Sequence, residues 1–147
     1  FSSDFIIGYP GEKIDDFKAT MKLMENVKFI NSYSFIYSAR PGTPAFSLDK
    51  INQKEAKSRL IKFQNLSEKI KINYKRNQIG KTVKVLFENK IKNENKYFGR
   101  DEHFNSVVVE GNDDIVGNIK SVKISKVNQS TLFGKVTSDQ NQTNYAA

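Results

Sequence analysis

The stretch Asp4-Phe-Ile-Ile-Gly-Tyr-Pro-Gly11 decides how the first half of the chain folds. Its apolar run over residues 4–8 is short and ends in glycine and proline, which is typical of a buried strand followed by a tight turn. Pro10 fixes its own φ, and Gly11 can adopt a positive φ. The stretch therefore predicts a strand whose carboxyl end leads directly into a sharp turn.

Beyond this turn the spacing of apolar residues changes to that of a helix. They recur at steps of three and four from Ile14 to Val27, which predicts an amphipathic helix, and Asp15 or Asp16 can cap it. Residues 33–37 resemble a second strand, and residues 38–44, with two prolines and a glycine, must form a loop. This order of elements favours a βαβ unit of a parallel α/β layer.

The chain is expected to be a fragment of a longer protein. It begins at Phe1 rather than at Met, directly inside the first strand-like run. Two strands do not make a stable sheet by themselves, so the predicted α/β layer needs partners from outside the chain.

The middle of the chain carries most of the positive charge. The 147 residues include 24 Lys and Arg and 16 Asp and Glu, a net charge of +8. Residues 51–80 hold eight of the basic and two of the acidic residues. Asn52 and Glu55 have the spacing of a capping box, so we expect a long linking helix from there to about residue 76. Its basic residues, Arg59 among them, are expected to face solvent or RNA.

After Gly80 the apolar residues recur with a period of two. Val83, Val85 and Phe87 begin this alternation. Four further short strands are separated by turns rich in Asn, Asp and Gly; they are expected at residues 97–100, 106–110, 119–127 and 132–136. Five short strands in so little sequence predict a small closed β-barrel. The expected division of the chain is a first domain at 1–77, the barrel at 78–137 and a flexible tail at 138–147.

The composition excludes several classes of site from this chain. Without cysteine there is no disulfide, no thiol catalysis and no zinc or iron–sulfur site held by its own thiolates. One histidine cannot form a His-rich metal site, so no metal site is expected here. His103 has no partner ligands in the sequence and is expected to be an exposed turn residue, so no catalytic residue is expected in this chain either. No apolar run approaches the roughly 18–20 residues of a membrane span, and no secretory signal opens the chain. We expect a cytoplasmic protein that does not bind membranes.

Three segments together resemble a known enzyme family. Residues 3–12 read Ser-Asp-Phe-Ile-Ile-Gly-Tyr-Pro-Gly-Glu, and residues 34–45 read Ser-Phe-Ile-Tyr-Ser-Ala-Arg-Pro-Gly-Thr-Pro-Ala. Both resemble the last part of the catalytic domain in the MiaB-type tRNA methylthiotransferases, which belong to the radical SAM enzymes. Residues 81–136, with Gly99-Arg100 and Asn105-Ser-Val-Val-Val109, are similar to the TRAM domain, a small β-barrel that holds RNA.

This resemblance implies two parts of different fold class (α/β + β), an α/β part followed by an all-β part. It comprises the last βα elements of a partial TIM-like radical SAM barrel, a linking helix and a five-stranded OB-like TRAM β-barrel. In the family, S-adenosyl-L-methionine and two [4Fe–4S] clusters serve to add a methylthio group to carbon 2 of isopentenylated adenosine beside the anticodon. Because the cluster cysteines are absent here, the resemblance implies an active parent enzyme and an inactive fragment. The expected partner is the tRNA anticodon arm, bound by a monomer.

The resemblance also suggests roles for individual residues. The first turn is expected to approach S-adenosyl-L-methionine through Gly8, Pro10, Gly11 and Glu12. The loop after the second strand is expected to face the substrate through Ser38, Arg40, Gly42 and Thr43. In the barrel, the candidates for RNA contact are Lys84, Arg100, Asn105, Lys120, Lys123 and Lys126. Purely structural roles in turns, caps and surface ion pairs stay open for all of them, and Phe98 and Phe104 are expected in the barrel core.

Two other functions stay open. One is a stand-alone RNA-binding β-barrel module without catalysis, which the missing cysteines would fit. The other is a methylthiotransferase of the same family that acts on threonylcarbamoyladenosine or on a ribosomal protein. The pair Arg40-Pro41 favours a tRNA substrate, because the ribosomal-protein branch of the family usually lacks it.

Overall fold

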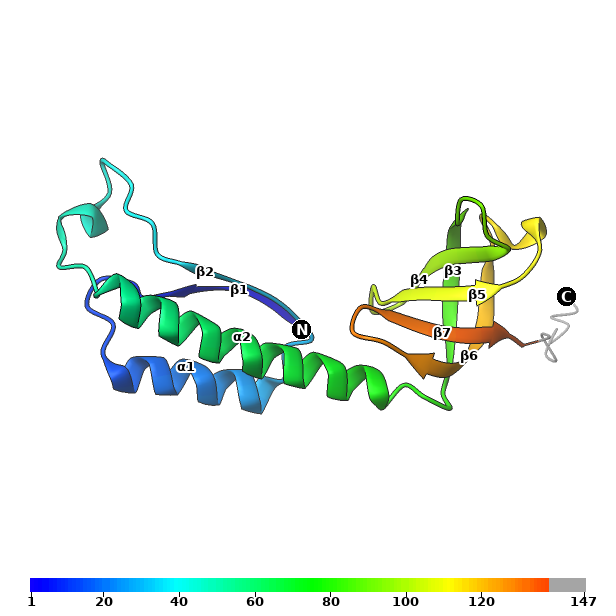
Figure 1. Ribbon diagram of the computed structural model, residues 1–147, viewed down its shortest axis with the longest axis horizontal. Coiled ribbons are helices and arrows are strands. Elements are labelled where there is room, and N and C mark those ends of the chain that lie inside the picture. The colour runs from blue at the N-terminus through cyan, green and yellow to red at the C-terminus, as the bar shows by residue number, and fades with distance from the viewer. Residues whose placement is uncertain (138–147) are drawn as a thin grey trace, which may run out of the picture. The chain divides into compact units, whose positions relative to one another are not determined.

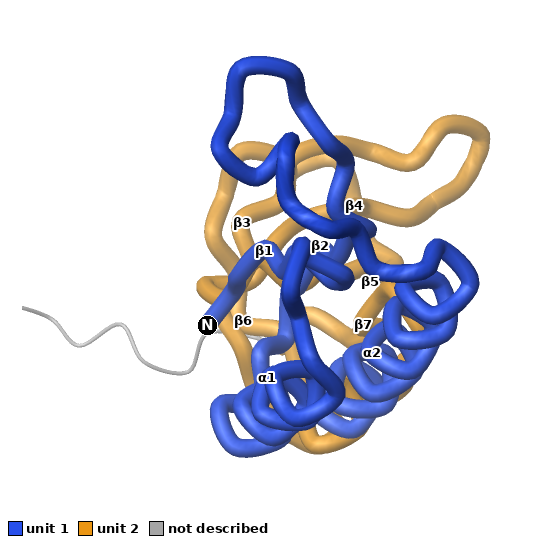
Figure 2. Tube along the Cα trace, turned by 90° about the vertical axis from the view of Figure 1, so that its left-hand side faces the viewer, with its two compact units in different colours: residues 1–74 blue, residues 75–147 orange. Residues whose placement is uncertain are grey.

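The chain divides into two compact units, and the boundary along the sequence lies between Tyr74 and Lys75 (Figure 2). A computed structural model describes residues 1–137. The predicted tail at residues 138–147 lies outside the described residues. Across residues 1–137, neither helix combines the length and the apolar content that a membrane span requires.

The first unit is a βαβ unit followed by a long helix (Figure 1). Its elements are β1 (Ser2–Ile7), α1 (Ile14–Val27), β2 (Asn31–Ile36), the 3-10 turn η1 (Pro44–Ser47) and α2 (Gln53–Arg76). β1 and β2 pair in parallel, in register from Ser2 opposite Asn31 to Ile7 opposite Ile36. The parallel pair confirms the predicted βαβ unit and brings the carboxyl ends of both strands to one edge.

The core of this unit lies on a single face of its sheet. Along β1, Phe5 and Ile7 are buried, whereas Ile6 between them is 58% exposed. The two buried side chains share a cluster with Phe17 and Met24 of α1 and Phe63 of α2. Both helices therefore cover the same face, and Figure 1 shows them side by side along the strands. Ile6 and its neighbours on the opposite face have no such cover within the described residues.

Local signals in the sequence set where the two helices begin. The Asp16 carboxylate accepts a hydrogen bond of 2.8 Å from the Lys13 N–H at the start of α1. At the start of α2, the side-chain oxygen of Asn52 accepts one of 2.9 Å from the Lys54 N–H. Each bond satisfies an N–H group that the helix itself leaves without a partner. The predicted cap at Asn52 is confirmed.

The second unit is a closed barrel of five strands. They are β3 (Thr82–Lys90), β4 (Lys96–Asp101), β5 (Ser106–Glu110), β6 (Ile119–Val127) and β7 (Thr131–Val136), with the 3-10 turn η2 (Asp113–Ile115) before β6. The strand order around the barrel is β3-β4-β5-β7-β6. β5 and β7 pair in parallel, and all the other pairs are antiparallel. This arrangement confirms the predicted five-stranded OB-like barrel.

The barrel closes tightly because small residues stand at two of its inner positions. A Cβ atom on Gly99 of β4 would lie 2.7 Å from Cγ1 of Val85, and one on Gly134 of β7 would lie 2.7 Å from Cγ1 of Val122. Any other residue would push these strands apart. The core around them is apolar and includes Val85, Phe87, Tyr97, Val107, Val122 and Leu132.

Candidate functional site

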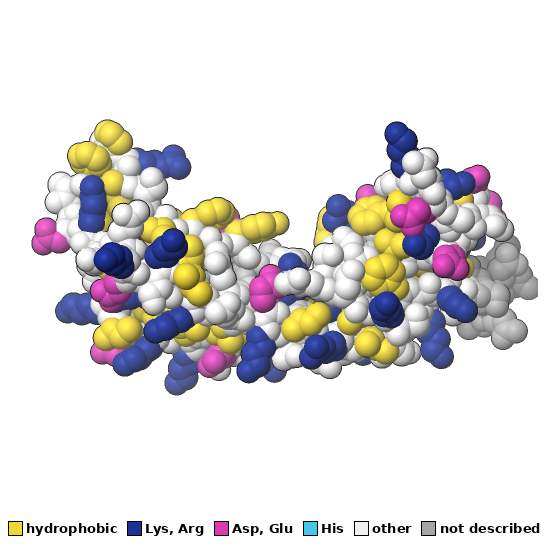
Figure 3. Space-filling view, in the orientation of Figure 1, with side chains coloured by type: hydrophobic (Ala, Val, Ile, Leu, Met, Phe, Trp, Pro, Cys, Tyr) yellow, Lys and Arg dark blue, Asp and Glu magenta, His cyan; other side chains and the backbone are white. Residues whose placement is uncertain are grey.

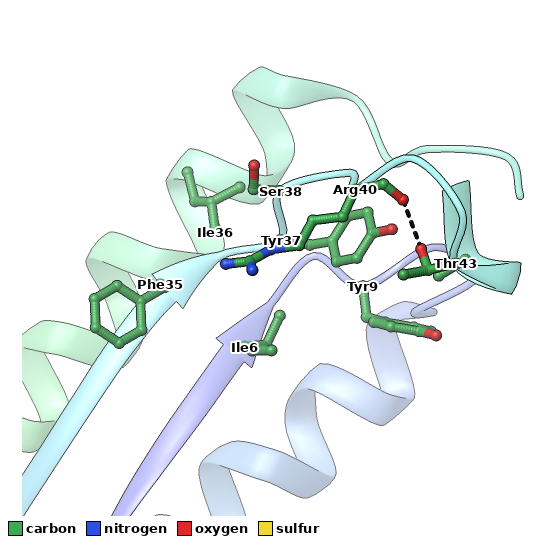
Figure 4. A pocket seen from close by; sticks show the side chains of 9 residues that line it. Ile6, Tyr9, Phe35, Ile36, Tyr37, Ser38, Arg40 and Thr43 are labelled. Carbon is green, nitrogen blue, oxygen red and sulfur yellow. Dashed lines mark hydrogen bonds between the residues drawn. The ribbon is translucent and has the colours of Figure 1, made fainter. Parts of the chain in front are cut away.

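An open pocket of about 610 Å³ lies at the carboxyl ends of β1 and β2 (Figure 4). Its walls come from the end of β1, from the turn after it, from β2 and from the loop that follows β2. The lining residues are Ile6, Tyr9, Phe35, Ile36, Tyr37, Ser38, Arg40, Thr43 and Ala45. The structure thus brings three of the predicted substrate-side residues, Ser38, Arg40 and Thr43, to one place.

Aromatic rings and one cation dominate this pocket. Tyr9 and Tyr37 pack edge to face, with ring centroids 5.2 Å apart. The Tyr37 hydroxyl is buried and has no hydrogen-bond partner among the described residues. Figure 4 shows the Arg40 side chain reaching back from the loop, beside Tyr37, toward Phe35. Arg40 makes no ion pair within residues 1–137, so its guanidinium is available to an anionic or planar ligand.

The loop that carries Arg40 is closed by its own backbone. The Arg40 carbonyl accepts hydrogen bonds from the Thr43 N–H at 3.3 Å and from the Thr43 hydroxyl at 2.8 Å. Gly42 adopts a φ of +83°, which favours glycine in this tight turn. Thr43 and Gly42 therefore shape the loop, and Arg40 and Ser38 are left to present their side chains to the pocket.

The turn after β1 is fastened to α2 by a buried arginine. The Arg59 Nη1 atom donates to the Glu12 carboxylate at 2.5 Å and to the Glu12 carbonyl at 3.1 Å. Arg59 also pairs with Glu55, one helical turn before it. The other carboxylate oxygen of Glu12 accepts the Gly8 N–H at 2.9 Å. The side chain of Arg59 is only 6% exposed, so the expectation that it faces solvent or RNA is wrong.

The environment of Arg59 keeps its charge fixed. Burial by itself would lower the pKa of the guanidinium, but the hydrogen bonds and the charges of Glu12 and Glu55 outweigh burial and raise the pKa above its ordinary value. Arg59 therefore links the first turn to α2 as a cation. Sequence reasoning missed it because Glu12 and Arg59 are far apart along the chain.

Gly8 has a packing role in the same turn. Its φ is +75°, and a Cβ atom there would lie 2.8 Å from the Cβ of Ala56 on α2. Together with the bonds of Glu12, this contact explains the turn without a ligand. Pro10 is buried and Gly11 is exposed, and the described pocket wall includes none of the four residues expected to bind S-adenosyl-L-methionine. Their role in cofactor binding stays a prediction.

The RNA candidates of the barrel are spread over different faces. Lys84 and Lys123 are exposed on the outer surface of β3 and β6, where Lys123 lies opposite Thr82. Lys120 pairs with the core residue Val85 and is half-buried. Lys126 lies beyond an irregularity in β6, opposite Phe133 of β7. These residues therefore do not form a single cluster, and their contact with RNA stays a prediction.

Arg100 extends over the outer surface of β4. Its guanidinium lies 5.4 Å from the ring centroid of Phe98, and its Nε atom lies 3.2 Å from a carboxylate oxygen of Glu88. Phe98 is half-buried on this outer surface and does not belong to the barrel core. The expectation that Phe98 is a core residue is wrong, because the alternation along β4 points Tyr97 and Gly99 inward and leaves Phe98 outside.

Asn105 stabilises the turn between β4 and β5. The buried Asp101 carboxylate accepts hydrogen bonds from the backbone N–H groups of His103 at 2.9 Å and Asn105 at 2.8 Å, and from the Asn105 side-chain amide at 2.8 Å. Asn105 is 7% exposed, so this amide is engaged within the turn. Contact of Asn105 with RNA stays a prediction.

The same turn holds Phe104 away from the core. Phe104 is 74% exposed, and its φ of +61° is rare for a bulky residue. The expectation of a core position is wrong here, because the Asp101 hydrogen bonds place residue 104 at the tip of the turn. No signal in the sequence separates this phenylalanine from one that belongs to a strand.

A polar cluster links β3 and β4 to the 3-10 turn η2. The buried Tyr97 donates its hydroxyl proton to the Asp113 carboxylate, and Lys90 donates to the same oxygen at 2.9 Å. The hydrogen bond from Tyr97, and then that from Lys90, lower the pKa of the Asp113 carboxyl. The bond to Asp113, and then burial, raise the pKa of the Tyr97 hydroxyl. Within residues 1–137, no group of three or more His, Asp or Glu side chains is placed to hold a metal ion.

Comparison with known proteins assigns the barrel to a domain family. The family described as TRAM domain matches residues 76–137. These residues form a TRAM domain. The match covers all five strands of the barrel and confirms the resemblance suggested by the sequence.

Similarity to known proteins extends over the rest of the chain as well. A tRNA-2-methylthio-N(6)-dimethylallyladenosine synthase of Pelagibacter ubique (strain HTCC1062) is 50% identical over 137 residues, which are 93% of this chain and 31% of that protein. The proteins of the same name from Photorhabdus laumondii and from Wolbachia pipientis subsp. Culex pipiens are 44% and 42% identical, over 96% and 91% of this chain and 30% and 31% of their own. The chain thus spans about 30% of the length of these curated relatives.

Proposed function

We propose that this chain is the C-terminal part of a tRNA methylthiotransferase that modifies isopentenylated adenosine beside the anticodon. The observation that carries the proposal is the 50% identity to a tRNA-2-methylthio-N(6)-dimethylallyladenosine synthase over 93% of the chain. The similarity includes both the βαβ unit and the TRAM domain. A stand-alone RNA-binding barrel would not need the first unit, so we favour the enzyme fragment.

In this proposal the two units divide the work. The TRAM domain holds the anticodon arm of the tRNA, and the first unit supplies the last βα elements of the catalytic barrel. The pocket at the carboxyl ends of β1 and β2 faces the substrate. α/β barrels bind their ligands at this edge of the sheet. Its tyrosine rings, the unpartnered Tyr37 hydroxyl and the Arg40 guanidinium suit a nucleoside with a neighbouring phosphate.

The iron–sulfur clusters of the reaction would be bound by residues outside this chain. The sequence has no cysteine, so its residues do not fit the role of [4Fe–4S] ligands. S-adenosyl-L-methionine, when bound in the parent enzyme, supplies the radical chemistry. The Gly8 N–H and the Glu12 carboxylate already make hydrogen bonds within the chain. Their role in binding S-adenosyl-L-methionine would therefore be to hold the first turn in position. We therefore expect no methylthiotransferase activity from this chain alone, and we expect the parent enzyme to be a cytoplasmic monomer.

A chimeric enzyme tests the proposal. The matching segment of the Pelagibacter relative is replaced by this chain, and the chimera is expressed in bacteria that lack their own synthase. Mass spectrometry of digested tRNA is expected to show the methylthio group on isopentenylated adenosine. The unaltered relative is the positive control, and this chain alone is the negative control.

Two outcomes would contradict the proposal. A chimera that accumulates in folded form and leaves the tRNA unmodified would show that the chain does not belong to such an enzyme. A methylthio group on threonylcarbamoyladenosine instead would assign the chain to the other tRNA branch of the family.

A further inference from the structure

A groove of about 560 Å³ lies on the outer surface of the TRAM domain, away from the candidates that the sequence suggested on β3. We call it the β7 groove. Its apolar lining residues are Val108, Val109, Phe133 and Val136, and its charged lining residues are Lys96, Glu110, Lys126 and Lys135. Figure 3 shows apolar and basic side chains next to one another over β4, β5 and β7.

An irregularity in β6 sets which residues meet in the β7 groove. Ile124 pairs with Gly134, but the next pair joins Lys126 to Phe133, so Ser125 is an extra residue in β6. The Ser125 hydroxyl donates to the Phe133 carbonyl at 3.3 Å. Such a bulge re-aims the side chains that follow it. Here it brings Lys126, rather than Ser125, opposite the phenylalanine ring.

The apolar part of the groove continues across the barrel. Phe98 of β4 pairs with Val108 of β5, and Val108 pairs with Phe133 of β7. These three side chains therefore form one row across neighbouring strands, with Phe98 and Phe133 at its two ends. Val108 is 9% exposed and both rings are half-buried. In many RNA-binding domains, unpaired bases stack on aromatic side chains that lie on the outer surface of a sheet.

The charge around the groove is suited to an anion. Lys126 and Lys135 make no ion pair within residues 1–137, while Lys96 pairs with Glu94. Glu110 is the acidic residue of the groove wall, so the three lysines leave an excess of positive charge. A phosphate chain crossing the groove would gain from Lys126 and Lys135 without first breaking a salt bridge.

We propose that the β7 groove binds unpaired nucleotides of RNA, with one base stacked on Phe133 and the flanking phosphates held by Lys126 and Lys135. The inference rests on the proposed function, because it assumes that the TRAM domain holds tRNA. It goes further by assigning the contact to one face and by requiring an unpaired base. An acidic peptide would use the same lysines but would not require the ring of Phe133.

Binding of the full chain to a fluorescent anticodon stem-loop tests the proposal, measured by anisotropy across a salt series. In the Lys126→Gln/Lys135→Gln variant, we expect weaker binding and a slope of log affinity against log salt that falls by about 1.4, since each contact to single-stranded phosphate contributes about 0.7. The matched control, Lys81→Gln/Lys92→Gln, removes the same charge at two exposed positions outside the groove and should leave the slope unchanged. Lys84→Gln/Lys123→Gln, at positions that the sequence suggested for RNA contact, should lower the slope less than the groove variant does.

A second variant tests the stacked base. Phe133→Leu keeps an apolar side chain and is expected to weaken binding about tenfold at every salt concentration, with no change of slope. Replacing a loop base by 2-aminopurine gives a direct signal, because stacking quenches its fluorescence. Thermal unfolding followed by circular dichroism verifies that each variant keeps the barrel.

The possible failures are distinguishable. If Lys84→Gln/Lys123→Gln causes the larger loss, RNA binds another face and the groove proposal is wrong, while the proposed function stands. If Phe133→Leu binds RNA normally, or if poly-glutamate of equal charge competes as well as RNA, the groove is a general anion site and the stacked base is wrong. If the unaltered chain binds no stem-loop at low salt, both this proposal and the RNA-holding role fail.

Discussion

Side chains alternate between the two faces in both sheets of this protein, but the sheets differ in how many of these faces are covered. In the TRAM domain the strands close on themselves, so every inward residue from Val85 to Leu132 finds apolar neighbours. In the first unit the two helices cover one face, and Phe35 on the other face is 58% exposed. Apolar residues can therefore mark a strand in either sheet, but only closure or a second layer covers both faces of that sheet.

Removing an aromatic ring from the barrel core is expected to change the stability of one unit relative to the other more than any other substitution considered below. Phe87→Ala should lower the free energy of unfolding of the TRAM domain by about 3–5 kcal/mol, because it leaves a cavity at a fully buried site. The first unit has a separate core and should keep its stability. Urea denaturation followed by circular dichroism measures both transitions.

The neighbouring residue provides the control for this experiment. Leu86 points outward and is 45% exposed, so Leu86→Ala should cost less than about 1 kcal/mol. Equal losses for the two variants would contradict the assignment of inner and outer faces in β3.

The first unit is expected to depend on its buried ion pair. Arg59→Met leaves the Glu12 carboxylate without its cation in a nearly buried position and should lower the free energy of unfolding of this unit by about 3 kcal/mol. Adding Glu12→Gln should recover part of that loss. Lys62→Met, at an exposed position of the same helix, is the control and should be nearly neutral in a thermal melt.

The polar cluster of the barrel predicts how its stability changes with pH. Because the folded state lowers the pKa of Asp113 below its ordinary 3.8, the stabilisation is complete above that value and is lost as the pH falls through the lowered pKa. The folded state raises the pKa of Tyr97 above 10.0, so at the alkaline end stability is lost as the pH rises through the raised pKa.

Melting temperatures measured over pH test this prediction. Asp113→Asn should flatten the acid limb of the curve. Asp114→Asn is the control. The hydrogen bond from the Asn118 side chain to Asp114 uses the Asp114 backbone carbonyl, so this substitution should leave the acid limb unchanged. An unchanged acid limb in Asp113→Asn would show that other carboxylates govern it.

The smallest effect on stability is expected at the uncovered face of the first sheet. Ile6→Thr and Phe35→Thr replace exposed apolar side chains, so each should change the free energy of unfolding by no more than about 0.5 kcal/mol. Both should reduce the binding of a hydrophobic dye and the self-association of the chain. A loss as large as that of Arg59→Met would mean that this face is packed in solution.

Much of the fold could be predicted from the sequence because its signals are local. The glycine and proline after β1, the Asn52 cap and the period of two after Gly80 each act over a few residues, and all were confirmed. The resemblance to the TRAM domain also rests on a continuous stretch. Such features do not depend on which distant segments come together.

The errors concern residues whose environment is made by distant segments or by irregular backbone. Arg59 lies on a helix rich in lysine and is buried only because Glu12 arrives from another element. The outward positions of Phe98 and Phe104 depend on which residues of β4 face inward and on the turn that the Asp101 hydrogen bonds stabilise. The proposed β7 groove was not apparent beforehand, because a one-residue bulge in β6, which leaves no mark in the sequence, sets the neighbours of Phe133.

The parallel pairing of β5 with β7 has a consequence for how the barrel forms. β3, β4 and β5 can pair as successive hairpins, but β5 keeps a free edge until β7 arrives, and β6 lies between them in the chain. During synthesis the barrel therefore cannot close before its last strand has left the ribosome. Until then the edge of β5 can pair with other chains, and closure over such distant contacts proceeds in milliseconds to seconds rather than microseconds. The nascent domain is thus most prone to aggregation just before its final strand is made.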